Sequence, residues 1–219
     1  MDTEKLEELR TQAVVEFGKV NRKGIDNVIW FLNENSDFFT APASTRFHMS
    51  VKGGLLQHSL NVLEALRGIL TYNDDGTYSY NVAGKDVLSK PISEESVIIM
   101  ALFHDICKVN FYSETTRNRK DAKGNWESYT AYEVNDKSPY GHGEKSVMML
   151  VRLGLELEND EMYAIRWHMG PPEGTERYTF DQAVEKFPIV WALHDADMLA
   201  SHLMEGNEGN LPLFSTDNQ

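Results

Sequence analysis

Cysteine and long apolar runs are scarce in this sequence, and each shortage excludes a class of protein. Cys107 is the only cysteine, so the chain cannot form a disulfide within itself, and we expect a reducing compartment. No apolar run is long enough to cross a membrane, and the polar, acidic residues 1–5 lack the features of a signal peptide. The sequence therefore predicts a cytoplasmic protein without a membrane partner.

Basic residues are also few, since 21 Lys and Arg stand against 34 Asp and Glu, which gives a net charge of -13. Binding of duplex nucleic acid relies on clustered basic side chains that neutralise phosphates, so we expect no duplex-binding groove. A nucleotide or a short strand held through metal ions is compatible with this charge. Hydrophobic residues make up 41% and charged residues 25%, as in an ordinary globular protein.

Apolar residues recur at helical spacing along most of the chain, which predicts a mainly α protein. Residues 111–135 differ, because tyrosines and Trp126 flank a Lys-Gly-Asn turn there, and they predict a β-hairpin. We expect one domain over residues 1–219, with its core at about 40–205 and a polar tail at about 206–219. The expected helices are 3–22, 25–34, a short one after Thr40, 53–70, 93–104, 142–154, 159–169, 181–187 and 188–205.

His104 and Asp105 end an apolar run, residues 97–103, that should form a buried helix. A buried carboxylate is unfavourable unless a cation or a hydrogen-bonding partner accompanies it. His104 and Asp105 can each offer a lone pair to a metal ion, and Lys108 follows one helical turn after His104. A metal, an imidazole, a carboxylate and a fixed cation together suit the handling of a phosphate. The alternative is a core histidine beside a capping or salt-bridged aspartate.

Three more histidines lie at the ends or on the inner faces of expected helices. His58 stands on an otherwise apolar helix, and His142 stands at a helix start between two glycines that leave room near its ring. His168 ends a helix before two prolines. Each also fits a structural role when taken alone: a core histidine at 58, a residue bonded to backbone at 142, or a helix C-terminal cation at 168.

The last helix offers two aspartates, and helical phase favours one of them. Asp197 lies one turn after Leu193 and one turn before Ala200, so it should point to the buried side. Asp195 falls on a different side of the helix. We therefore predict Asp197 as the metal ligand, and we expect His194, three residues earlier, to orient it.

Taken together, the order His…His-Asp…His…His…Asp resembles the HD-domain superfamily of metal-dependent phosphohydrolases. The likeness is closest to the HD domain of YhaM-type 3′-exoribonucleases and to small bacterial and phage HD proteins. It implies an HD-domain helical bundle, into which the small β-hairpin expected at 111–135 is inserted. Members of the family carry glycine where this chain has Cys107. The segments that carry the resemblance are 53–60, 104–108, 141–146, 167–170 and 193–197.

The resemblance also implies a ligand set. The minimal set of the family, carried over to this chain, holds one metal with His58, His104, Asp105 and Asp197. Adding His142 and His168 resembles the dinuclear branch, in which Asp105 would bridge two ions. Four imidazoles and two carboxylates suit two divalent transition-metal ions with open positions, and imidazole-rich ligation favours Mn, Fe, Co, Ni or Zn over Mg.

These features predict a phosphohydrolase or phosphodiesterase acting on a small phosphorylated substrate: a nucleotide, a cyclic nucleotide or a short oligonucleotide. A hydroxide bridging the two metals would attack phosphorus in line, with Asp105 and Lys108 as catalytic residues. We expect Lys108, Arg46 and Lys145 to bind the phosphate, and Arg166 is a further candidate. Arg46, Lys145 and Arg166 also fit the role of ordinary surface charges. Trp126 and the tyrosines of the hairpin can stack on a base, or serve packing and solubility.

Two other functions are compatible with the same residues. A di-iron oxygenase resembling myo-inositol oxygenase uses the same pattern of six ligands, and it too can carry the lysine. A non-catalytic nucleotide-binding module is the third possibility, although intact ligands argue against it.

Overall fold

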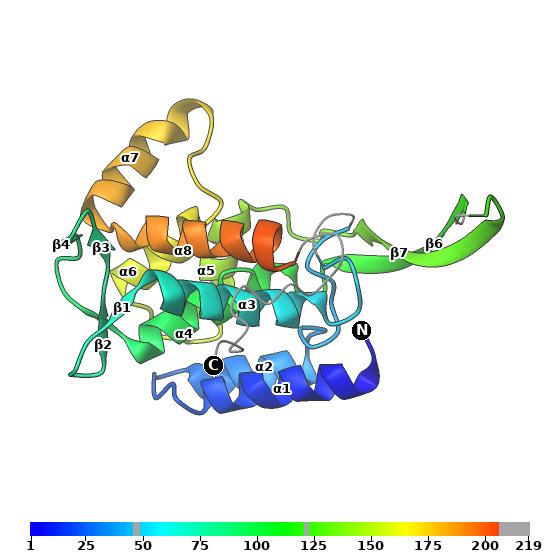
Figure 1. Cartoon of the computed structure of the whole chain (residues 1–219), viewed down its shortest axis with the longest axis horizontal. Coiled ribbons are helices and arrows are strands. Elements are labelled where there is room, and N and C mark those ends of the chain that lie inside the picture. Colours follow the sequence, from blue (N-terminus) through cyan, green and yellow to red (C-terminus); the bar gives the residue numbers. More distant parts are fainter. Residues whose placement is uncertain (46–48, 121–122, 206–219) are drawn as a thin grey trace, which may run out of the picture.

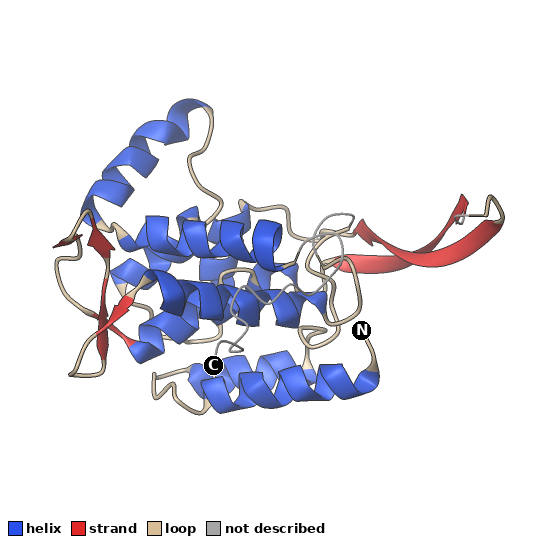
Figure 2. Cartoon of the chain, in the orientation of Figure 1, coloured by secondary structure: helices blue, strands red, loops and turns tan. Residues whose placement is uncertain are grey.

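The computed structural model describes residues 1–45, 49–120 and 123–205. These residues form eight α-helices and a few short strands, so the prediction of a mainly α protein is confirmed (Figures 1 and 2). No helix among them is both long and apolar enough to span a bilayer. The helices are α1 (Thr3–Phe17), α2 (Ile25–Glu34), α3 (Gly54–Ile69), α4 (Glu94–Phe103), α5 (His142–Arg152), α6 (Asn159–Trp167), α7 (Arg177–Lys186) and α8 (Ile189–Leu199).

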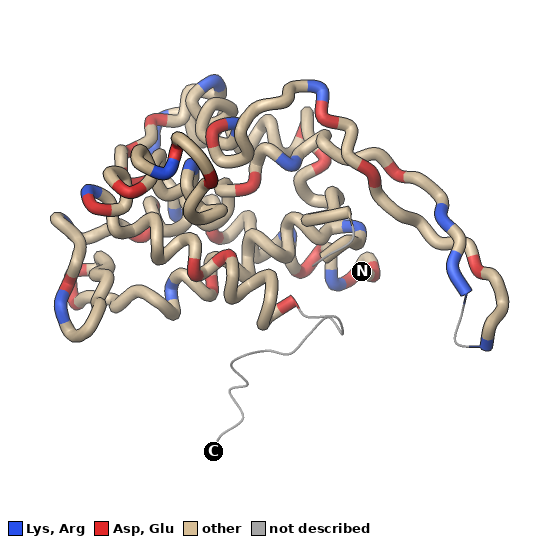
Figure 3. The backbone as a smooth tube through the Cα atoms, turned by 90° about the horizontal axis from the view of Figure 1, so that it is seen from above, with Lys and Arg blue, Asp and Glu red and all other residues tan. Residues whose placement is uncertain are grey.

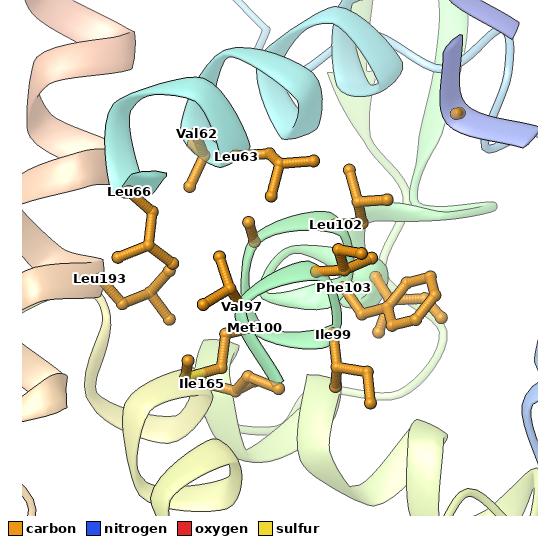
Figure 4. Close-up of a cluster of buried hydrophobic side chains, with 14 of the residues drawn as sticks. Val62, Leu63, Leu66, Val97, Ile99, Met100, Leu102, Phe103, Ile165 and Leu193 are labelled. Atoms are coloured by element: carbon orange, nitrogen blue, oxygen red, sulfur yellow. The ribbon is translucent and has the colours of Figure 1, made fainter. Parts of the chain in front are cut away.

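Helix α4 forms the centre of the molecule, and all its residues from Ser96 to Phe103 are buried. It begins where the Ser93 hydroxyl accepts a hydrogen bond from the Ser96 amide at 3.2 Å, as an N-cap serine does. A helix that is apolar all round must be covered on all sides. Helices α3 and α6 pack on it, α8 packs on both of them, and Figure 4 shows side chains of all four in one cluster.

Helices α1 and α2 lie together along one side of this bundle (Figure 1). Phe17 of α1 stacks on Phe103 of α4 with ring centroids 5.7 Å apart. Burial of two such rings is a large apolar contribution, so this contact joins the N-terminal pair of helices to the centre of the fold. The end of α4 is thereby held rigidly just before the His-Asp pair.

The strands form three small antiparallel sheets. Strands β1 (Thr71–Tyr72), β2 (Thr77–Ser79) and β5 (Ile92–Ser93) form one sheet, and β3 (Asn81–Val82) and β4 (Lys85–Asp86) form another. The predicted hairpin is confirmed as β6 (Tyr112–Lys120) and β7 (Trp126–Val134), with Thr116 opposite Thr130. It projects from the helical body as a long arm (Figure 1).

Several predicted boundaries differ from the structure. Residues 41–45, the described ones directly after Thr40, form a loop with bends instead of a short helix, and the helix expected at 181–187 begins earlier, at Arg177. The last expected helix changes character at Leu199, where a π-helical turn, Ala200–Met204, follows α8. That turn directs Glu205 inward, as described below. The predicted tail, 206–219, and Arg46 lie outside the described residues.

Candidate metal centre

Two of the predicted ligands sit directly after the last turn of a helix, and the helix itself orients them. His104 follows α4, and its Nδ1 lies 2.8 Å from the carbonyl oxygen of Ala101. His168 follows α6, and its Nδ1 lies 2.7 Å from the carbonyl oxygen of Ile165. Because a carbonyl only accepts, each Nδ1 carries the hydrogen, and in the neutral ring the lone pair is left on Nε2.

His58 is oriented in the same sense by a carboxylate that the sequence did not indicate. Its Nδ1 lies 3.0 Å from Oε1 of Glu205, which also accepts a hydrogen bond from the Asn61 amide at 2.8 Å. The Glu205 side chain is only 1% exposed. His58 Nε2 therefore faces the opposite way, 3.2 Å from His104 Nε2 and 3.2 Å from Asp197 Oδ1.

Asp105 lies at the middle of the cluster. Its Oδ1 is 2.6 Å from His142 Nε2 and 3.6 Å from His168 Nε2, while its Oδ2 is 3.4 Å from His104 Nε2. Oδ2 also accepts from the Lys108 ammonium at 2.6 Å. Burial by itself would raise the pKa of Asp105, but Lys108 and the neighbouring histidines hold that pKa well below its usual value. The group is therefore a carboxylate with one oxygen turned to each side of the site.

The arrangement fits a bound cation better than a purely structural cluster. Nε2 of His168 is buried and has no hydrogen-bond partner among the described residues, although a buried polar atom normally has one. Burial alone would lower the pKa of His58, but Asp197 and Glu205 raise it to about 10, so the site favours positive charge at its Nε2. A divalent metal ion supplies that charge and accepts the lone pairs.

Three overlapping groups bring their ligand atoms within 4.8 Å of one another. Each offers histidine nitrogen together with carboxylate oxygen, the donors that divalent transition metals take. All six predicted metal ligands occur in these groups. The groups are His58, His104 and Asp197; His104, Asp105 and His168; and Asp105, Cys107 and His142.

The glycine after His142 allows two helices to approach closely. A Cβ atom on Gly143 would lie 2.1 Å from the carbonyl oxygen of Arg166, a contact that no side chain tolerates. The start of α5 can therefore lie against the end of α6, where the rings of His142 and His168 are 5.3 Å apart. The sequence predicts that this glycine leaves room for the imidazole ring, whereas in the structure the backbone of α6 occupies that space.

Helix α8 places its two aspartates differently, as helical phase predicts. Asp197 reaches the cluster, where burial would raise its pKa but His58 and the other histidines lower it. Asp195 is exposed. His194 does not take the predicted role beside Asp197: its Nδ1 forms a 2.7 Å hydrogen bond with the carbonyl oxygen of His168. It therefore steadies the end of α6.

The other predicted phosphate-binding residues are placed unequally. Lys108 is part of the cluster, whereas the Lys145 ammonium binds Asp136 at 2.6 Å and lies 5.0 Å from the centre of the Phe111 ring. A cavity of about 680 Å³ lies at the exposed side of the site and is lined by His142 and Arg166, among others. Arg166 is thus the described cation that lines an open approach to the cluster.

Replacing Glu205 by alanine is expected to weaken metal binding by about 10–100-fold, the usual effect of removing a hydrogen-bond partner of a ligating histidine. Without the carboxylate, the His58 ring loses the contact that orients its Nε2. Glu205→Gln should restore part of the affinity, because its amide oxygen still accepts from Nδ1. Chelator competition on the folded variants measures the effect, with the exposed Glu64→Ala on α3 as control. Equal affinity in Glu205→Ala and in the control would contradict this role.

Comparison with protein families matches residues 55–203 to the HD domain. The matched stretch contains every predicted metal ligand and Lys108, and it ends just before Glu205. No curated protein and no solved structure matches the chain. The narrower resemblance to YhaM-type exoribonucleases therefore stays a prediction.

Proposed function

Because the chain belongs to the HD-domain family of metal-dependent phosphohydrolases, we propose that its histidine-aspartate cluster hydrolyses a phosphate ester of a nucleotide or short oligonucleotide. One observation supports this most directly. Three imidazoles, each fixed through Nδ1, turn their Nε2 atoms toward two carboxylates, with a lysine ammonium in the same cluster. Side chains held in this way are preorganised for metal binding, since little rearrangement is needed on binding.

We propose two ions for each chain, held by different sides of the cluster. His58, His104 and Asp197 would hold one, and His142 and His168 would hold the other. Asp105 would belong to both sets because its two oxygens face different ligands. Bound transition-metal ions would supply a water of lowered pKa and a Lewis acid for phosphoryl oxygens.

Lys108 contributes fixed positive charge. Burial lowers the pKa of its ammonium, but Asp105 raises that pKa above its usual value, so the group stays protonated. A fixed cation next to a phosphoryl group stabilises the negative charge that develops in the transition state. Asp105 holds the ammonium at 2.6 Å, which keeps the charge beside the ligands instead of in solvent.

Substrate would enter from the side of His142, the most exposed histidine of the cluster, with 32% of its side chain accessible. The adjoining cavity carries Arg166, which pairs with Glu144 at 3.0 Å. A phosphate is a bidentate acceptor that suits a guanidinium, so Arg166 can exchange this carboxylate for a substrate phosphate.

Protein purified without chelator is expected to contain about two transition-metal ions per chain and to release product from phosphodiesters in the absence of oxygen. Elemental analysis measures the ions. Activity is measured under argon as the hydrolysis of bis(p-nitrophenyl) phosphate, nucleotides, cyclic nucleotides and short oligonucleotides. The matched variants are His142→Ala and His168→Ala, each of which should lower the metal content to about one ion.

Each alternative has its own outcome in this experiment. A single tightly bound ion that persists in both histidine variants would contradict the dinuclear centre. Oxygen uptake with a di-iron spectrum, and no ester cleavage, would indicate an oxygenase. Nucleotide binding without any turnover by the metal-loaded protein would indicate a binding module.

A further inference from the structure

The β6–β7 hairpin, residues 112–134, forms an arm that the metal centre does not account for. Its strands are nine residues long each and extend away from the helical body (Figure 1). Among the hairpin residues that the structure describes, only Ala131 and Tyr132, near its base, are buried. At about 3.3 Å per residue, the arm reaches roughly 27 Å from its base. A long exposed ribbon of this kind contributes little to the packing of the core, and its surface is available to bind another molecule.

The outer half of the arm is basic, although the protein as a whole is strongly acidic. Residues 117–129 contain four basic and two acidic residues, in a chain with a net charge of -13. Figure 3 shows several blue segments and fewer red ones toward the end of the arm, whereas blue and red segments are mixed over the body. A local positive surface on an acidic protein attracts an anionic ligand to that place and repels it from the body.

Aromatic rings lie beside these cations on both faces of the ribbon, since the register places Trp126 with Lys120 on one face and Tyr129 with Arg117 on the other. Lys120 stands opposite Trp126 in the strand register, and its ammonium lies 5.5 Å from the centre of the Trp126 ring. The Arg119 guanidinium lies 5.0 Å from the Tyr129 ring and pairs with Glu127 at 2.6 Å, so a phosphate would exchange for that carboxylate. Arg117 is the register partner of Tyr129. Trp126 is 71% exposed, which leaves much of the indole accessible.

Accessible rings with cations beside them suit single-stranded nucleic acid, which can wrap around a narrow ribbon and contact both of its faces. Phosphates bind the cations, and unpaired bases stack on the rings whatever their sequence. The bases of a duplex are already stacked on one another, so exposed rings gain little from it. A second copy of this chain fits less well, because stable interfaces between copies have apolar cores, and this part of the arm is polar and charged.

The base of the arm lies beside the metal centre. Strand β6 begins at Tyr112, four residues after Lys108, whose ammonium lies 2.6 Å from Asp105. The Tyr112 hydroxyl also donates to the carbonyl oxygen of Ala43 at 3.3 Å, which ties the base of the arm to the body. A strand lying along the arm would therefore have one end near the cluster.

We propose that the arm docks single-stranded nucleic acid, RNA or DNA, and presents its end to the metal centre, which makes an oligonucleotide the substrate. This inference rests on the proposed hydrolytic function for its last step. The docking step does not depend on it, because Trp126, Tyr129 and the cations are separate from the metal ligands.

The test uses the full, metal-loaded chain and labelled phosphorothioate oligothymidylate and oligouridylate of about twelve nucleotides, within the usual range of single-strand sites. Trp126→Ala should weaken binding by about tenfold, measured by fluorescence anisotropy. Arg117→Gln combined with Arg119→Gln should reduce the slope of log affinity against log salt by about 1.4. Stronger binding of one polymer would identify RNA or DNA as the ligand.

The chain offers matched controls. Trp30 on α2 is 60% exposed, so Trp30→Ala removes a comparable ring outside the arm. Arg177 on α7 also lies over a ring, 5.8 Å from the centre of Phe180, so Arg177→Gln is the control for charge. Both controls should bind the oligonucleotides as the unmodified protein does. Equal weakening in a control and in its arm variant would overturn the proposal.

Hydrolysis separates the two proposals. With unmodified oligonucleotides, Trp126→Ala should raise KM by about tenfold and leave hydrolysis of bis(p-nitrophenyl) phosphate unchanged. The docking surface would be overturned by unchanged binding in the arm variants or by equal competition from duplex DNA. It would also be overturned if the unmodified protein were a dimer and Trp126→Ala a monomer. Arm-dependent binding by a protein that cleaves no ester would reject the hydrolase and retain the docking surface.

Discussion

Replacing Asp105 by alanine is expected to remove both metal ions of the proposed centre and to lower activity by about a thousandfold or more, because one carboxylate would serve both ligand sets. Its two oxygens lie within 3.6 Å of four histidine nitrogens, and Oδ2 lies 2.6 Å from the Lys108 ammonium. Elemental analysis and turnover of bis(p-nitrophenyl) phosphate measure the two losses on the same preparation. Circular dichroism shows whether the variant is folded, since a buried ammonium left without its partner is destabilising.

Lys108→Ala is the informative comparison, since it removes the cation and leaves every ligand in place. We expect it to keep both metals and to lose roughly 100- to 1,000-fold in rate, the effect of removing one group that stabilises transition-state charge. A metal-free or unfolded Lys108→Ala would assign this lysine a structural role. An Asp105→Ala variant with both ions still bound would contradict the bridging position of Asp105.

The second large effect is expected at Asp197. Asp197→Asn keeps the size of the side chain but removes a negative charge that faces His58 at 3.2 Å. The site would then be under-neutralised for a divalent ion, so metal occupancy and activity should fall by about two orders of magnitude or more. Measurement of metal content and turnover on one substrate decides the outcome.

Asp195 provides the matched control on the same helix. It is exposed, two residues away and on another side of α8, so Asp195→Asn should alter stability by no more than about 0.5 kcal/mol. It should also leave metal content and rate nearly unchanged, since an exposed carboxylate contributes little. An inactive Asp195→Asn beside a working Asp197→Asn would mean that the ligand had been assigned to the wrong side of the helix.

Much of the fold follows from patterns that need no long-range information. The apolar run 97–103 is a helix that only burial can satisfy, and helical phase alone separates Asp197 from Asp195. The alternating residues around Lys123-Gly124-Asn125 form the predicted hairpin. Histidine and aspartate at helix ends are chemically distinctive, so the sequence also indicates which residues gather. These are local properties, because the spacing of apolar residues within one helix or strand is enough to show which of its faces is buried.

The period does not show what the buried face meets, and only the tertiary structure decided that. Glu205 forms a hydrogen bond with His58, which lies 147 positions earlier in the chain. The π-helical turn that brings Glu205 there is not predicted by the spacing of apolar residues. Gly143 makes room for the Arg166 carbonyl, and His194 bonds to the backbone of His168 instead of orienting Asp197. Each of these contacts depends on the exact approach of two helices distant in the sequence. The sequence by itself determined the class of fold and the set of candidate ligands, while the packing of the helices determined how those ligands are oriented and which neighbours hold them.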